Sequence, residues 1–199
     1  MPLLPKLPIL VGESLTSYLN RVALFHFNIG LSDYLRSFEI SQQEAMLPTS
    51  STIRRFSKLT GVDCSELEKM TARAGGKKVR FIGGQAVHPN FFHLNRRPLC
   101  PFCLLADGES DSPSQGVFVD RAAWQIQYVR TCSVHGVALQ EHKAHKYEDR
   151  FRFLPELGSR QTDLEMMASI AQRQQPSDLE HYIVDRINGS SGPAWLDGQ

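Results

Sequence analysis

The chain has 199 residues, which is enough for one medium-sized domain or two small ones, each with its own hydrophobic core. Hydrophobic residues make up 41% and charged residues 22%, as in ordinary globular proteins, and the net charge of +1 excludes a strongly basic chain. Four cysteines exclude a disulfide scaffold, and no apolar run reaches the roughly 18 residues that a transmembrane helix needs. We therefore expect a cytoplasmic protein that makes no membrane contact.

Two helices are predicted near the N-terminus. The prolines of residues 1–12 favour extended backbone there. Apolar side chains at three- and four-residue steps predict a helix over residues 13–27, with Ser14 as a cap near its start. Residues 28–30 supply a left-handed stop, and a second helix is expected from Ser32.

Residues 50–74 carry the next informative pattern. A short helix is predicted over residues 52–59, followed by a glycine turn. Asp63 and Glu66 form a D-x-x-E capping box for a second helix that runs to about Arg73. This order is typical of a helix-turn-helix, although many all-helical folds share it without touching DNA.

Basic residues gather around this pattern and again before the first cysteine pair. Such residues suit phosphate contacts, which add affinity without reading sequence, and a solvated loop is the competing explanation. Phe91 and Phe92 could stack on bases, but we expect them to pack in the core beneath the neighbouring cysteines. The candidate nucleic-acid-binding residues are Arg54, Arg55, Lys58, Arg73, Lys77, Lys78, Arg80, Arg96 and Arg97.

The strongest motif combines two short knuckles. Cys100 and Cys103 form a CxxC pair, Cys132 and His135 form a CxxH pair, and 28 residues separate the two pairs. A two-residue gap lets both side chains of a pair reach one ion, and a closed set of three cysteines and one histidine is typical of a structural Zn²⁺ site. The alternative is a redox or buried cysteine pair beside an unrelated surface histidine. We predict a structural zinc ion on these four residues, with Trp124 packed across it.

The remaining elements follow the second knuckle. His142 and His145 form an H-x-x-H pair that could make a second metal site, could compete for the first, or could lie on the surface without a ligand. Helices are predicted over residues 162–173 and from Pro176 to about residue 187.

These patterns predict a mainly α protein with small zinc-ribbon β elements. A helical, helix-turn-helix-like domain is expected over residues 1–95 and a zinc-knuckle domain over residues 96–155. Residues 156–199 are expected to form a helical segment that begins a truncated C-terminal domain.

Several motifs also occur in a recognisable order. They are Glu13-Ser14-Leu15-x-Ser17-Tyr18-Leu19-x-Arg21, Leu59-Thr60-Gly61 before the capped helix that ends Met70-Thr71, Cys100-Pro101-x-Cys103-Leu104, Trp124-Gln125 and Cys132-x-x-His135-Gly136-x-x-Leu139. Together they resemble the TniQ/TnsD family of transposon target-selection proteins over nearly the whole chain. Family members often carry a second cysteine pair where His142 and His145 stand. They also commonly continue past a segment like Pro193 to Leu196, so a truncated chain or a short form is expected.

The resemblance implies a bacterial adaptor rather than an enzyme. Such proteins select the insertion site and recruit an AAA+ ATPase, which brings the transposase, to a target marked by DNA sequence or by a CRISPR effector with its guide RNA. A homodimer is left open. The residues agree, since no Walker-type loop, nucleophile elbow, or HxE or HExxH motif is present.

Two alternatives stay open beside this interpretation. The first is a zinc-containing helix-turn-helix transcription regulator that binds a defined operator without an ATPase. The second is a zinc hydrolase or deaminase, which would need an open coordination position and a nearby glutamate.

Overall fold

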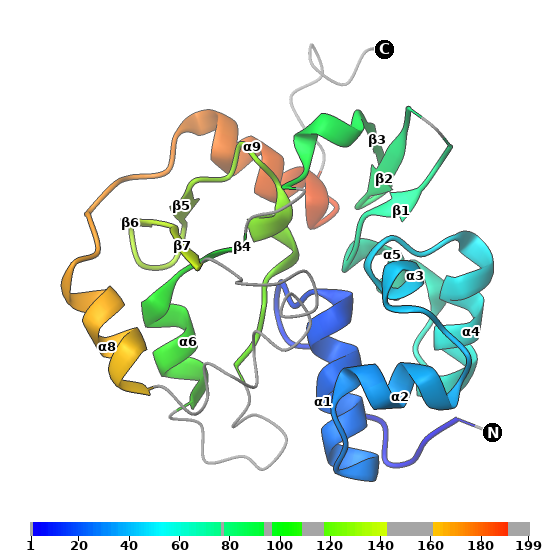
Figure 1. Ribbon diagram of the computed structural model, residues 1–199. Coiled ribbons are helices and arrows are strands. Elements are labelled where there is room, and N and C mark those ends of the chain that lie inside the picture. Colours follow the sequence, from blue (N-terminus) through cyan, green and yellow to red (C-terminus); the bar gives the residue numbers. More distant parts are fainter. Residues whose placement is uncertain (1, 77, 94–96, 109–117, 143–160, 191–199) are drawn as a thin grey trace.

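The computed structural model describes residues 2–76, 78–93, 97–108, 118–142 and 161–190. The helices of this part are α1 (Leu15–Phe27), α2 (Leu31–Ser37), α3 (Gln42–Met46), α4 (Ser50–Thr60), α5 (Cys64–Lys69), α6 (Pro101–Gly108), α8 (Gln161–Ser169) and α9 (Asp178–Ile187). The strands and 3₁₀ turns are β1 (Arg73–Ala74), β2 (Arg80–Ile82), β3 (Gln85–Val87), η1 (Pro89–Phe91), β4 (Arg97–Leu99), η2 (Ala122–Gln125), β5 (Thr131–Cys132), β6 (Val137–Ala138) and β7 (Gln140–His142). Helices α1–α5 lie on one side, α6, α8 and α9 on the other, and β1–β3 beside α5 (Figure 1). The prediction of a mainly helical protein with small β elements is confirmed.

Helix α1 carries the centre of the first core. The Ser14 hydroxyl accepts a hydrogen bond from the Ser17 N–H, as predicted for its cap, and Asn28 ends the helix with a left-handed φ of 54°. The helix starts two residues later than predicted, because Glu13 pairs with Arg121 in an isolated β-bridge. The buried residues that join α1 to α2–α5 include Leu15, Tyr18, Leu19, Val22, Tyr34, Leu35, Ile53, Phe56 and Leu67.

Helices α4 and α5 are joined by a glycine turn as predicted, but α5 is shorter than expected. Gly61 ends α4 with a φ of 70°. Asp63 makes no side-chain capping hydrogen bond, so the predicted capping box is wrong. The helix ends at Lys69 rather than near Arg73, because the Met70 carbonyl accepts from the Leu15 N–H and the chain then enters β1. The role of this helix pair in DNA reading remains a prediction.

A three-stranded antiparallel sheet follows, in the order β1-β2-β3. Its second turn is Gly83-Gly84, with φ of 55° and 80°, the left-handed geometry that a two-residue hairpin favours. The sheet packs on α9 in a third core cluster, and a Cβ on Gly83 would lie 2.4 Å from the Ile187 carbonyl oxygen. The buried members of this cluster are Ala72, Ile82, Phe92, Ile126, Val129 and Ile187.

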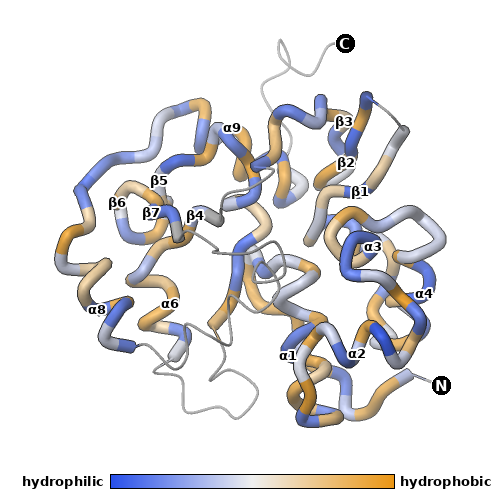
Figure 2. The backbone as a smooth tube through the Cα atoms, viewed as in Figure 1, coloured by the Kyte–Doolittle hydropathy of each residue, from blue (hydrophilic) through white to orange (hydrophobic). Residues whose placement is uncertain are grey.

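The second core cluster lies under the cysteine-rich segment. Strand β4 pairs with β7 and β5 pairs with β6, both antiparallel, while α8 packs on α6. Helix α6 is hydrophobic over most of its length (Figure 2). Among the described helices, none is both long and apolar enough to cross a membrane. The division of the chain near residues 95 and 155 remains a prediction.

Candidate metal centre

Four ligand-type side chains come together from two distant segments. Cys100 follows β4, and Cys103 lies in the first turn of α6. Cys132 ends β5, and His135 lies in the turn to β6. Gly136 closes this turn with a φ of 57°, and its N–H donates to the Cys132 carbonyl at 2.9 Å. Each two-residue gap therefore aims two side chains at one point, as the sequence predicted.

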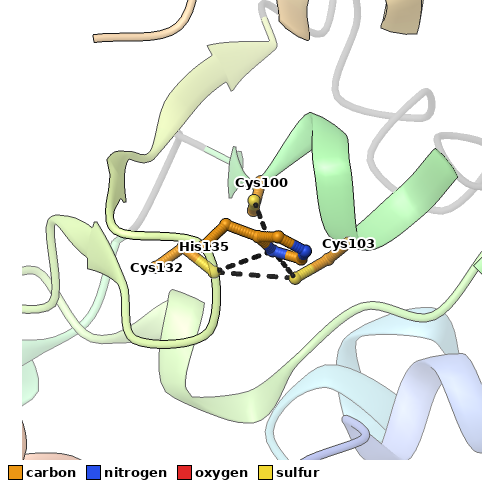
Figure 3. Close-up of side chains that lie close together, drawn as sticks. All are labelled: Cys100, Cys103, Cys132 and His135. Atoms are coloured by element: carbon orange, nitrogen blue, oxygen red, sulfur yellow. Dashed lines mark hydrogen bonds between the residues drawn. The ribbon is translucent and has the colours of Figure 1, made fainter. Parts of the chain in front are cut away.

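The four ligand atoms form a compact cluster (Figure 3). The Nδ1 atom of His135 lies 3.5 Å from the Sγ of Cys100, 3.3 Å from that of Cys103 and 3.6 Å from that of Cys132. The Sγ atoms of Cys103 and Cys132 are 3.6 Å apart, and all four ligand atoms lie within 4.8 Å of one another. A tetrahedral zinc ion with ordinary bond lengths would separate two sulfurs by about 3.8 Å and a sulfur from a nitrogen by about 3.6 Å. The cluster could therefore hold a metal ion.

The three thiols of the cluster influence one another's ionisation. All three cysteines are free and buried, whereas His135 is exposed. Contacts with the Cys100 and Cys103 thiols lower the pKa of Cys132, while contacts with the other two thiols and burial raise the pKa of Cys103. One thiolate that accepts hydrogen bonds from neighbouring thiols is thus favoured over three, and a cation must replace the remaining protons if all three are to ionise.

Apolar side chains surround the cluster. Trp124 is buried in the same core as the three cysteines, which confirms the prediction that it packs there. The Arg121 guanidinium lies over the Trp124 ring at 5.4 Å and makes an ion pair with Asp107, one helical turn after Cys103. The other buried residues of this core are Leu99, Leu104, Val137 and Leu164.

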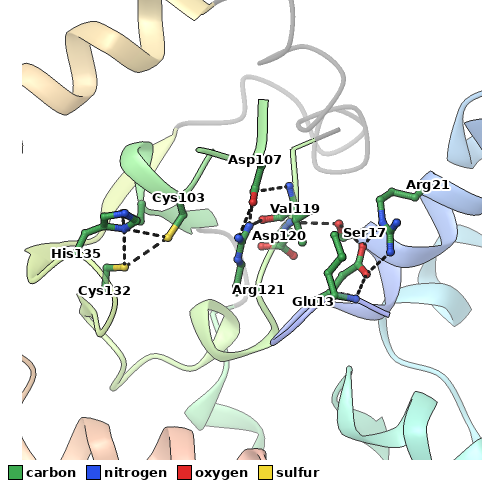
Figure 4. Close-up of polar contacts among 12 residues, drawn as sticks. Glu13, Ser17, Arg21, Cys103, Asp107, Val119, Asp120, Arg121, Cys132 and His135 are labelled. Carbon is green, nitrogen blue, oxygen red and sulfur yellow. Dashed lines mark hydrogen bonds and ion pairs between the residues drawn. The ribbon is translucent and has the colours of Figure 1, made fainter. Parts of the chain in front are cut away.

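A buried polar network begins on the helical side of the molecule (Figure 4). The Arg21 guanidinium makes two hydrogen bonds of 2.7 Å to the Glu13 carboxylate and a third of 2.7 Å to the Pro8 carbonyl. The Ser17 hydroxyl donates to Glu13 at 3.3 Å. Four-residue steps along the chain bring Glu13, just before α1, to the same side as Ser17 and Arg21 of the helix. The four-residue spacing is the sequence signal for this network, which was not among the predicted site residues.

The same network reaches the segment that leads to the second knuckle. The Ser14 hydroxyl donates to the Asp120 carboxylate at 2.8 Å, and the Ser14 N–H donates to the Asp120 carbonyl at 2.8 Å. The Asp120 N–H in turn donates to the Ser17 hydroxyl at 3.2 Å. Residues of the Glu13–Arg21 motif therefore hydrogen-bond α1 to Asp120, which directly precedes Arg121 in the chain.

The candidate nucleic-acid-binding residues fall into distinct groups. Arg54, Arg55 and Lys58 are exposed on α4, and Arg55 also donates to the Phe38 carbonyl. Their one-sided placement agrees with a surface contact.

The cations of the hairpin are more constrained. Arg73 donates to the Ser50 hydroxyl at 2.9 Å and pairs with Glu68 at 3.3 Å. Arg80 is half-buried, with its guanidinium 5.3 Å from the centre of the Phe92 ring, and burial lowers its pKa. These contacts hold the two side chains in place within the fold.

Some of the remaining candidate nucleic-acid-binding and metal-binding residues lie outside the part of the chain that the structure describes. Lys78 is exposed, and the backbone of Arg97 pairs with that of His142 between β4 and β7. Lys77, Arg96 and His145 lie outside the described residues. The prediction of a second metal site at His142 and His145 is therefore not tested.

A cavity of about 720 Å³ lies beside the cluster. Residues from the helical side, such as Val11 and Met70, line it together with Val134 and His135 of the second knuckle and Ile187 of α9. The knuckle turn is thus exposed to a hollow that both sides of the molecule form.

Comparison with known protein families gives a match over most of the described chain. The model of the family described as TniQ matches residues 4–139. This range begins before the Glu13–Arg21 motif and ends after His135, so it contains both the buried network and the candidate metal cluster. No curated protein matches the chain.

Proposed function

Because the chain belongs to the TniQ family of transposition-associated proteins, we propose that it is a non-catalytic adaptor that selects the insertion target. In this role it recruits an AAA+ ATPase regulator, and through it the transposase, to target DNA or to a CRISPR effector with its guide RNA. The family match over residues 4–139 is the observation that carries this proposal.

The proposed metal is a structural Zn²⁺ ion held by Cys100, Cys103, Cys132 and His135. Zinc would supply positive charge to neutralise the thiolates and would link two segments that are far apart in sequence. Four protein ligands fill a tetrahedral ion, which leaves no open position for substrate or water. This donor set supports an adaptor over a zinc hydrolase or deaminase.

We further propose that nucleic acid contacts the exposed basic face of α4. Arg54 and Lys58 are one helical turn apart and exposed, which suits contacts to successive phosphates. Helix α5 is a less suitable helix for reading DNA, because it spans only Cys64–Lys69 and exposes Glu66. The α4–α5 pair would then act like a helix-turn-helix through its first helix.

Reconstitution with the ATPase and transposase of the same element tests the adaptor role. We expect the wild-type protein to direct insertion to one target and to retain the ATPase on that target in a pull-down. Charge reversal at Arg54 and Lys58 should weaken DNA binding and reduce its salt dependence, because fewer counterions are then released. Charge reversal at the exposed Arg36 of α2 is the matched control. Tight binding to a defined operator without any ATPase recruitment would instead identify a transcription regulator.

A further inference from the structure

Two exposed aromatic rings meet on the surface beyond the hairpin. Phe91, at the end of η1, and Tyr128, after η2, have ring centroids 4.9 Å apart and ring planes tilted by 56°. Phe91 is 38% exposed and Tyr128 is 40% exposed. The sequence predicts that Phe91 and Phe92 pack in the core beneath the neighbouring cysteines, but Phe91 is exposed and Phe92 is buried in the third core cluster instead.

The backbone holds this aromatic pair firmly. The Gln127 N–H donates to the Phe91 carbonyl at 2.7 Å, and the His93 N–H donates to the Gln125 carbonyl at 2.9 Å. Between these bonds, Phe92 and Ile126 form an antiparallel bridge and are buried in the third core cluster. The two rings are therefore presented by ordered backbone rather than by a free loop.

The two chain segments that carry the rings contain basic but no acidic residues, and two of these basic residues, Arg73 and Arg121, are paired with Glu68 and Asp107. Residues 73–106 contain six Lys or Arg and no Asp or Glu, and residues 121–140 contain two Arg and no Asp or Glu. Arg80 lies over the ring of Phe92, and Arg130, two residues after Tyr128, is exposed. The Glu180 carboxylate, which accepts from the Arg130 N–H, is buried and already bonded. This environment complements a polyanion.

We propose that Phe91 and Tyr128 form a stacking platform for an unpaired base of single-stranded nucleic acid. Exposed aromatic faces beside cations are the usual means of binding single strands, because every base has a face that can stack. Bases inside a duplex are already stacked and do not reach such a platform. This inference refines the nucleic-acid contact proposed above and rests on it.

Fluorescence anisotropy with labelled oligodeoxythymidine, oligouridine and a mixed-sequence duplex tests the platform. Phe91→Leu and Tyr128→Leu preserve apolar packing but remove the aromatic face. We expect each to weaken single-strand binding by about five-fold or more while leaving duplex binding unchanged. Tyr128→Phe should bind like wild type, as should Phe25→Leu, which removes an exposed ring on α1. Comparing the affinities for oligodeoxythymidine and oligouridine shows whether the platform prefers DNA or RNA.

The outcomes separate this inference from the adaptor proposal. If wild type and both leucine variants bound single strands equally well, the platform alone would be overturned. The same would follow if the leucine variants lost duplex binding as much as they lost single-strand binding. If the wild type bound no nucleic acid, both the platform and the α4 contact would be wrong. Recruitment of the ATPase, measured separately in the pull-down, would still decide the adaptor role.

Discussion

The Glu13 carboxylate and the Arg21 guanidinium lie 2.7 Å apart, with side chains that are 0% and 1% exposed. Burying two charges is costly unless further hydrogen bonds satisfy them. Here the Pro8 carbonyl and the Ser17 hydroxyl supply such bonds, and Ser17 also accepts from the Asp120 backbone. The ion pair thus lies within the contact that joins α1 to the metal-cluster side of the molecule.

We predict that Arg21→Met destabilises the protein by about 3–5 kcal/mol, because it leaves the Glu13 carboxylate buried without its partner. Urea denaturation of wild type and variant measures this change. Arg36→Met is the control, since its ion pair with Asp33 is exposed and should contribute little. A double variant, Glu13→Gln with Arg21→Met, should recover part of the loss. Equal destabilisation by Arg21→Met and Arg36→Met would contradict the importance of burial.

We predict one zinc ion per chain, lost in Cys132→Ser. Zinc binding contributes about 10–16 kcal/mol in isolated zinc-finger peptides, so the variant should also melt at a lower temperature. Elemental analysis and thermal melting measure the two effects together. Strong chelators should lower the melting temperature of the wild type in the same way.

Cys64→Ser is the matched control for this prediction, because Cys64 lies on the helical side outside the cluster. It should retain zinc and stability. His142→Ala with His145→Ala should also retain one zinc ion. A Cys132→Ser protein with full zinc content would show that the ligand assignment is wrong.

Short-range spacing allowed most of the candidate site to be predicted. The CxxC and CxxH gaps determine which side chains share a turn, so Cys100, Cys103, Cys132 and His135 could be grouped before their geometry was known. The four-residue steps from Glu13 to Arg21 carried a similar signal.

Contacts between distant segments could not be predicted from the sequence. Nothing local to Asp120 indicates that it bonds to Ser14, because that contact depends on how two distant segments pack. The end of α5 was mispredicted for the same reason. Local preference allowed a helix to continue to Arg73, but pairing with β2 places that residue in a strand.

We predict that Glu180 stabilises the protein in a pH-dependent way. Burial alone would raise the pKa of Glu180, but hydrogen bonds from the Ser177 and Arg130 backbone N–H groups outweigh it and lower the pKa. A lowered folded-state pKa gives stability that is present above the unfolded-state pKa and is lost as pH falls through the folded-state value. Glu180→Gln should therefore destabilise the protein at neutral pH by about 1.5–3 kcal/mol.

Denaturant titrations of wild type and Glu180→Gln, from neutral pH down through the folded-state pKa of Glu180, measure the difference in their free energies of unfolding. Release of metal by acid affects both proteins equally and cancels in this difference. The difference should shrink as the solution is acidified. Glu165→Gln, on the exposed face of α8, should show no such trend. A constant difference at all pH values would assign the loss to packing rather than to charge.

We predict that Gly83→Ala separates the hairpin from α9, whereas Gly84→Ala does not. Both glycines have positive φ, so alanine costs about 1–2 kcal/mol of backbone strain at either position. At Gly83 the new Cβ would also lie 2.4 Å from the Ile187 carbonyl oxygen, while at Gly84 nothing lies within 4 Å. Overpacking of this kind adds about 1–3 kcal/mol of destabilisation.

Two measurements test this prediction. Chemical denaturation should give a lower free energy of unfolding for Gly83→Ala than for Gly84→Ala, and amide hydrogen exchange should be faster in α9 only in Gly83→Ala. Equal stability and equal exchange would mean that the hairpin does not pack on α9 in solution.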